Sequence, residues 1–85
     1  MAQRRLPAIE VGYQAFAVGS EEEFGAVRAL APSSIVVYIE DFGDTTVPLS
    51  AVTEVIEEKV IVDTAKLDQK VRDAIARAHR DEDYP

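Results

Sequence analysis

Three acidic side chains at a turn are the first place in this sequence where chemistry could occur. Glu40, Asp41 and Asp44 surround Phe42 and Gly43 between two apolar runs. Calcium binds such carboxylates, but a calcium loop spaces its oxygen ligands regularly around a glycine and ends on a distant bidentate glutamate. This turn is too short for that pattern. We therefore expect a solvated turn here and no metal site, with a weak divalent-cation site at these three acids as the alternative.

The other side chains capable of catalysis form no recognisable arrangement. His79 is the only histidine, and neither a His-x-x-x-His nor a Glu-x-x-His spacing occurs in the sequence. The chain has no cysteine, which removes disulfides, thiolate zinc sites and iron–sulfur clusters. No nucleophile elbow and no phosphate-binding glycine loop is present. The sequence therefore predicts a protein that is not an enzyme and that needs no cofactor.

Charge is unevenly distributed along the chain and bears on its partners. Nine Lys and Arg oppose 16 Asp and Glu over 85 residues, so the protein is acidic, with a formal net charge of −7 at pH 7. Residues 33–62 hold one cation and six anions, whereas residues 63–85 hold five of the cations. Because the acidic middle segment would repel phosphate, the sequence disfavours nucleic acid as a partner.

Length and hydropathy bear on membrane insertion, cellular location and the number of domains. No run approaches the roughly 18 apolar residues of a membrane span, and Glu10 interrupts the N-terminal segment before a signal-peptide core could form. We expect no membrane insertion and, given the absence of cysteine, a cytoplasmic location. A chain of 85 residues is one domain with a thin surplus of stability, to which association of two copies into a homodimer would add.

Alternating and β-branched segments predict five to six short strands. Residues 21–30 also contain good helix formers, but Gly25 and the turn at residues 31–33 favour a strand. Pro48 has no N–H to donate, so a strand ends or reaches a sheet edge there. The expected strands cover residues 8–18 with a kink at Gly12, residues 25–30, a hairpin over residues 34–47, and residues 52–56 and 59–62.

The last segment changes its hydrophobic period from two to 3.6 residues. Its apolar residues fall on one helical face, which predicts an amphipathic helix over residues 64–80 capped by Asp63 or Thr64. Residues 81–85 are expected to be a frayed acidic tail. A basic stripe borders the apolar face, and it consists of Lys66, Lys70, Arg77 and Arg80.

These cations and one aromatic residue are the candidates for contact with a partner. The basic stripe is the one locally basic surface of an acidic chain, and it could dock against an acidic surface, including that of a second copy. Phe42 stands at a turn tip where core packing is not expected, so it could anchor such a contact.

The order of these elements over residues 15–62 resembles the PRC-barrel family, a small SH3-like barrel of the photosynthetic reaction centre H subunit and of the C-terminal part of a bacterial ribosome maturation factor. The matching segments are residues 24–27 for the family's Gly-x-Val step, residues 47–52 for its Val-Pro-Leu-x-x-Val step and residues 59–62 for its closing strand. Residues 20–23 depart from the Asp-Gly or Asn-Gly common there, and residues 1–14 and the helix have no counterpart. The resemblance implies a role in assembly and protein contact, with no shared catalytic residues.

We therefore expect a mainly β fold, a small SH3-like or PRC-type barrel of five to six short strands with one C-terminal amphipathic helix. An α+β arrangement of an antiparallel sheet with one packed helix is the alternative. The expected function is a non-catalytic protein-interaction or assembly module whose protein partner is unknown. A second hypothesis is a small-molecule or divalent-cation binding domain. A third is an RNA- or ribosome-associated accessory protein that binds through the basic stripe.

Overall fold

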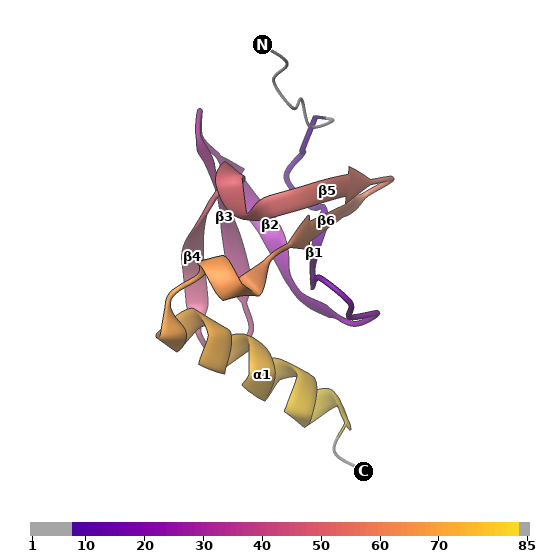
Figure 1. The fold of residues 1–85 in the computed structure, drawn as a ribbon, viewed down its shortest axis with the longest axis vertical. Coiled ribbons are helices and arrows are strands. Elements are labelled where there is room, and N and C mark those ends of the chain that lie inside the picture. The colour runs from indigo at the N-terminus through magenta and orange to yellow at the C-terminus, as the bar shows by residue number, and fades with distance from the viewer. Residues whose placement is uncertain (1–7, 84–85) are drawn as a thin grey trace.

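A computed structural model describes residues 8–83 of the chain, and the side chains of residues 8–78. Over this range the fold is mainly β, with six strands curled into a half-barrel sheet and one C-terminal helix (Figure 1), as the sequence predicts. The elements are β1 (Gln14–Ala17), β2 (Glu23–Leu30), β3 (Ser34–Ile39), β4 (Gly43–Pro48), β5 (Val52–Ile56), β6 (Lys59–Val62) and α1 (Gln69–Asp83), with short 3-10 turns at Leu49–Ala51 and Thr64–Lys66.

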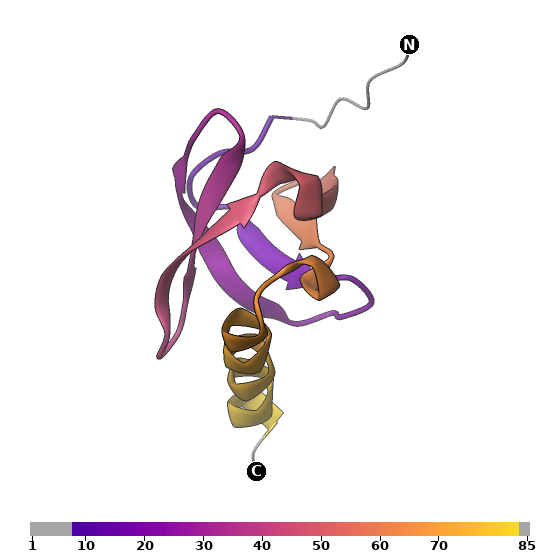
Figure 2. The same cartoon turned by 60° about the vertical axis from the view of Figure 1, so that its left-hand side comes forward.

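The sheet has the strand order β4-β3-β2-β1-β6-β5. Neighbouring strands are antiparallel except for β1 and β6, which run parallel from the pair Gln14 and Lys59 to the pair Ala17 and Val62. Figure 2 shows how the sheet curls around its inner face while α1 lies across one end. Strand β4 lies at one edge of the sheet and has Pro48 as its last residue, which confirms the position inferred from the missing N–H.

The core fills the inner face of the curled sheet. Along β3, the buried residues Ile35, Val37 and Ile39 alternate with the more exposed Val36 and Tyr38, so every second side chain points inward. The other strands contribute mainly valines to this core, and α1 and the residues before it contribute Leu67, Ala74 and Ile75. Burial of these last three side chains holds the helix against the end of the sheet.

The first strand is shorter than the sequence suggests. Ile9, Val11 and Tyr13 alternate as in a strand, but Gly12 has a φ of 101° and the Tyr13 N–H donates to the Glu10 carbonyl at 3.2 Å. Residues 10–13 therefore form a turn, and β1 begins only at Gln14. The prediction of one strand over residues 8–18 was wrong because positive φ at Gly12 reverses the chain where only a kink was expected.

The helix also has different limits from those predicted. The Asp63 carboxylate accepts a hydrogen bond from the Ala65 N–H at 3.1 Å and closes a 3-10 turn over Thr64–Lys66. Leu67 is then extended, with φ −103° and ψ 161°, and buries its side chain. Helix α1 begins at Gln69, not at Thr64, and continues to Asp83. Residues 81–83, expected to fray, are helical, and residues 84 and 85 lie outside the described part.

Candidate functional site

The β3–β4 turn faces the middle of α1 across a small hollow. Its volume is about 130 Å³, and it is lined by Glu40, Asp41 and Phe42 of the turn and by Ala74, Arg77 and Ala78 of the helix. Two residues that the sequence singled out separately, Phe42 and Arg77, are thus brought to one place. No sequence pattern indicated this meeting, because it depends on how the helix crosses the end of the sheet.

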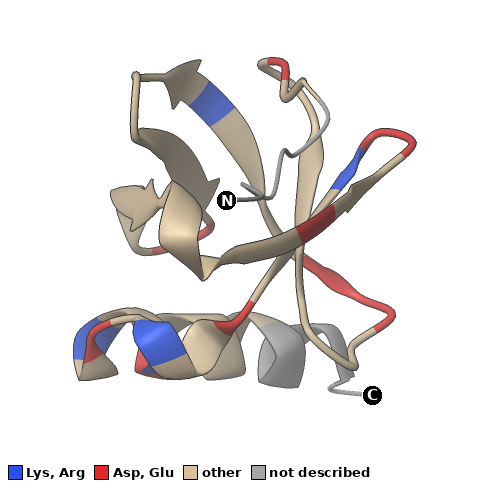
Figure 3. Ribbon diagram, turned by 45° about the horizontal axis from the view of Figure 1, so that its top comes forward, with Lys and Arg blue, Asp and Glu red and all other residues tan. Residues whose placement is uncertain are grey.

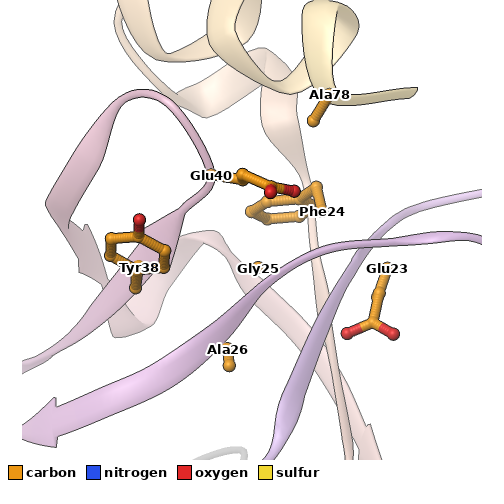
Figure 4. A pocket seen from close by; sticks show the side chains of 7 residues that line it. All are labelled: Glu23, Phe24, Gly25, Ala26, Tyr38, Glu40 and Ala78. Atoms are coloured by element: carbon orange, nitrogen blue, oxygen red, sulfur yellow. The ribbon is translucent and has the colours of Figure 1, made fainter. Parts of the chain in front are cut away.

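A second and larger hollow of about 380 Å³ shares Glu40 and Ala78 with the first. It is lined by residues 23–26 at the start of β2, by Tyr38 and Glu40 at the end of β3, and by Ala78 of α1. Figure 4 shows Tyr38 and Glu23 on opposite sides of Gly25, with Ala78 approaching from the helix. We call the two adjoining hollows together the α1 groove.

Local backbone geometry fixes the turn that carries Phe42. The Phe42 N–H donates to the Ile39 carbonyl at 3.0 Å, and both Asp41 and Gly43 have positive φ, at 65° and 103°. Positive φ is costly for an aspartate and free for a glycine. The tight turn leaves Phe42 38% exposed beside the helix. An aromatic side chain is therefore presented to solvent on a constrained backbone.

Gly25 forms the floor of the larger hollow because β2 and β3 approach closely there. A Cβ at this position would lie 2.3 Å from the Tyr38 carbonyl oxygen and 2.9 Å from Val37 Cγ1. Residue 25 pairs with Ile39 in the antiparallel register. Only glycine fits without separating the strands, which gives a packing reason for this residue at the groove.

Strands β2, β3 and β4 carry a charged and aromatic group on the outer face of the sheet. Arg28 Nε lies 3.1 Å from Asp44 Oδ1, and the Arg28 guanidinium carbon lies 4.9 Å from the centre of the Tyr38 ring. Both members of the ion pair are more than half exposed. Asp44 is directly opposite Tyr38 in the ladder, which explains how one arginine reaches both.

The fold separates the three acids of the β3–β4 turn. Glu40 and Asp41 line the groove, whereas Asp44 pairs with Arg28 on the face of the sheet. Among the described residues, no group of three or more acidic or histidine side chains is placed to hold a metal ion. The weak divalent-cation site that the sequence offers as an alternative at Glu40, Asp41 and Asp44 stays a prediction.

The basic stripe is divided by the fold. Lys66 lies in the 3-10 turn before α1, and its Nζ donates to the Ser50 carbonyl at 3.2 Å. Lys70 is exposed on the first turn of α1, Arg77 lines the groove, and the Arg80 side chain lies outside the described residues, as does that of His79. Figure 3 shows cations on the early part of α1 and acids at the turns of the sheet.

Several groove residues were missed by reasoning from the sequence. Glu23 and Phe24 lie before the strand predicted over residues 25–30, and Tyr38 lies within the predicted hairpin; none of the three was a candidate site residue. The one available signal for Tyr38 was its place between the alternating core residues Val37 and Ile39, which puts it on the opposite face of the strand. That signal indicates exposure but does not indicate a groove.

No helix in residues 8–83 is long and apolar enough to cross a bilayer. Comparisons of the chain with protein families, with curated proteins and with solved structures found no match. The resemblance to the PRC-barrel family stays a prediction.

Proposed function

We propose that this protein is a non-catalytic interaction module that binds a protein partner through the α1 groove. The observation that carries the proposal is the position of Phe42, an aromatic residue 38% exposed on a constrained turn beside Arg77. Aromatic residues and arginine are the types that dominate the binding energy of protein interfaces. A rigid backbone also lowers the entropy lost on binding.

The dimensions of the groove support a short partner segment. Pockets for small ligands occupy about 300–1,000 Å³, and the larger hollow, with about 380 Å³, lies at the lower end of that range. The adjoining hollow of about 130 Å³ would take one small side chain beside the Phe42 ring. We therefore expect the partner to insert side chains from one segment, with the surrounding surface adding a polar rim.

Capture from native lysate tests this function when the bait is varied at one position. The unmodified protein should retain a discrete partner, and Phe42→Ala should lose it, because truncation of an aromatic anchor typically costs more than 1 kcal/mol of binding free energy. Val18→Ala is the matched control, since Val18 is 58% exposed and lines neither hollow. A sedimentation series over concentration shows whether the partner is a second copy. A strict monomer that captures nothing, or equal capture by both variants, contradicts the proposal.

A further inference from the structure

We propose that the larger hollow of the α1 groove receives an arginine side chain from a segment of a different protein. This assignment rests on the proposed function and names the chemistry of the partner. Three features of the hollow support it, namely its charge, its exposed aromatic residue and the small residues that line it.

The charge of the hollow favours a cation. Among the residues whose side chains the structure describes, Glu23 and Glu40 are the only charged ones that line it. Asp41 adds a third acid in the adjoining hollow, where Arg77 is the one cation among residues 8–78. One oxygen of Glu23 accepts a hydrogen bond from Gln14 Nε2 at 2.8 Å, which orients the carboxylate without neutralising it. With a net charge of −7, the whole protein would also attract a basic segment over longer distances.

The molecule already shows how an arginine binds at this ring. Arg28 lies over the Tyr38 ring while its Nε pairs with the Asp44 carboxylate. Tyr38 lines the hollow but Arg28 does not, so part of Tyr38 remains available on the side of the hollow. Figure 4 shows Glu40 between Tyr38 and Glu23, with its carboxylate over Phe24 and away from the Tyr38 ring. A second guanidinium that lies between Tyr38 and Glu40 could contact the ring and pair with the carboxylate, as Arg28 does with Tyr38 and Asp44.

Small residues line the hollow. Ala26 of β2 and Ala78 of α1 each add a single methyl group, and Gly25 adds no side chain. A planar guanidinium stacks on an aromatic ring and meets a carboxylate through two parallel N–H groups, whereas the compact ammonium of lysine does neither. These features favour arginine over lysine.

Fluorescence anisotropy with labelled octapeptides tests the assignment. The probes alternate glycine with arginine, with lysine or with citrulline, which has nearly the shape of arginine but no charge. The arginine peptide should bind at least several-fold more tightly than the lysine peptide and lose affinity as salt is added. The citrulline peptide should not bind measurably at the same concentration. Equal binding of the arginine and lysine peptides overturns the choice of arginine, and binding of the citrulline peptide as tightly as the arginine peptide overturns the ionic basis.

Two double variants with the same net charge distinguish the effect of the acids in the hollow on peptide binding from the effect of the overall charge of the protein. Glu23→Gln/Glu40→Gln should weaken binding of the arginine peptide about tenfold or more, because each removes a charged partner from the hollow. Glu54→Gln/Glu58→Gln removes two exposed acids that line neither part of the groove, and should change affinity by about twofold at most at physiological salt. Equal losses in both variants overturn the site.

A folding check and two further comparisons distinguish the possible outcomes. Circular dichroism checks each variant, and Glu40→Gln alone, at an exposed turn position, replaces the double variant if Glu23→Gln disturbs the sheet. If the peptides fail these tests while Phe42→Ala still loses its captured partner, the arginine assignment is wrong and the interaction function stands. Arg4 and Arg5 are adjacent arginines of this chain that a second copy could insert into the groove. If Arg4→Ala/Arg5→Ala abolishes self-association of the chain, the groove takes a second copy, which overturns the assignment to a different protein.

Discussion

Replacement of Gly25 by alanine tests the close approach of β2 and β3 that forms the groove floor. The new Cβ would lie 2.3 Å from a backbone oxygen, that of Tyr38, and 2.9 Å from Val37 Cγ1. A flexible side chain could move aside, but a carbonyl in the sheet ladder moves only with its strand. We expect Gly25→Ala to separate the two strands locally and to destabilise the fold.

The magnitude follows from two opposing effects. Overpacking a well-packed site typically costs about 1–3 kcal/mol, and contact with backbone places this site toward the upper end. Alanine also restricts the unfolded chain, which returns about 0.4–1 kcal/mol. The free energy of unfolding should therefore fall by about 2–2.5 kcal/mol, a large part of the stability of a domain of this size.

Urea denaturation followed by far-UV circular dichroism measures this change. The transition midpoint should move to lower urea with little change in slope. Ala26→Gly is a matched control at the next position, where loss of a half-buried methyl and added backbone freedom should cost only about 0.5–1 kcal/mol. A Gly25→Ala protein as stable as the unmodified one, or more stable, would refute the close approach of the two strands.

Substitutions at four further positions test other parts of the structure by the same denaturation assay. Gly43→Ala should lower the free energy of unfolding by about 1–2 kcal/mol through backbone strain alone, since φ is 103° and no atom lies within 4 Å of a new Cβ. Gly43→Asn should lower it less. An alanine variant as stable as the unmodified protein would contradict the turn geometry. Glu57→Gly should gain stability by up to about 1 kcal/mol, because Glu57 holds a φ of 57°, and a clear loss would contradict this. Ile39→Ala should lose about 2–5 kcal/mol because the side chain is fully buried, so a loss below 1 kcal/mol would remove Ile39 from the core. Asp44→Asn should lower the free energy of unfolding by less than about 1 kcal/mol, and only at low salt, because the ion pair with Arg28 is exposed. A larger loss that does not depend on salt would show that this pair is more than a surface contact.

Much of the sheet could be predicted because its strands have strong local patterns. Ile35, Val37 and Ile39 alternate with outward residues, and Pro48 marks a strand end at an edge. The start of β1 could not be predicted, because alternation at Ile9, Val11 and Tyr13 also suits a turn through Gly12. The parallel pairing of β1 with β6 depends on contacts distant in sequence, so no local pattern indicates it.

The helix boundary shows how tertiary burial overrides periodicity. Leu67 has the helical spacing of the apolar face, yet it packs in the core from an extended backbone, so α1 begins after it. Only two residues of the groove could be predicted as candidates from the sequence. Phe42 and Arg77 were recognised as exposed candidates, but their meeting, and the part played by Glu23 and Tyr38, depends on where α1 crosses the end of the sheet.

A map of amide chemical shifts tests the central claim that recognition occurs at the α1 groove. The ¹⁵N-labelled protein is titrated with the peptide that alternates glycine and arginine, at physiological salt. We predict that the largest shifts fall at Gly25, Tyr38, Glu40, Phe42 and Ala78, on three separate elements that meet only in the folded protein. Shifts concentrated at the acidic β5–β6 turn of Glu57 and Glu58, or spread evenly over all exposed acids, would contradict the claim.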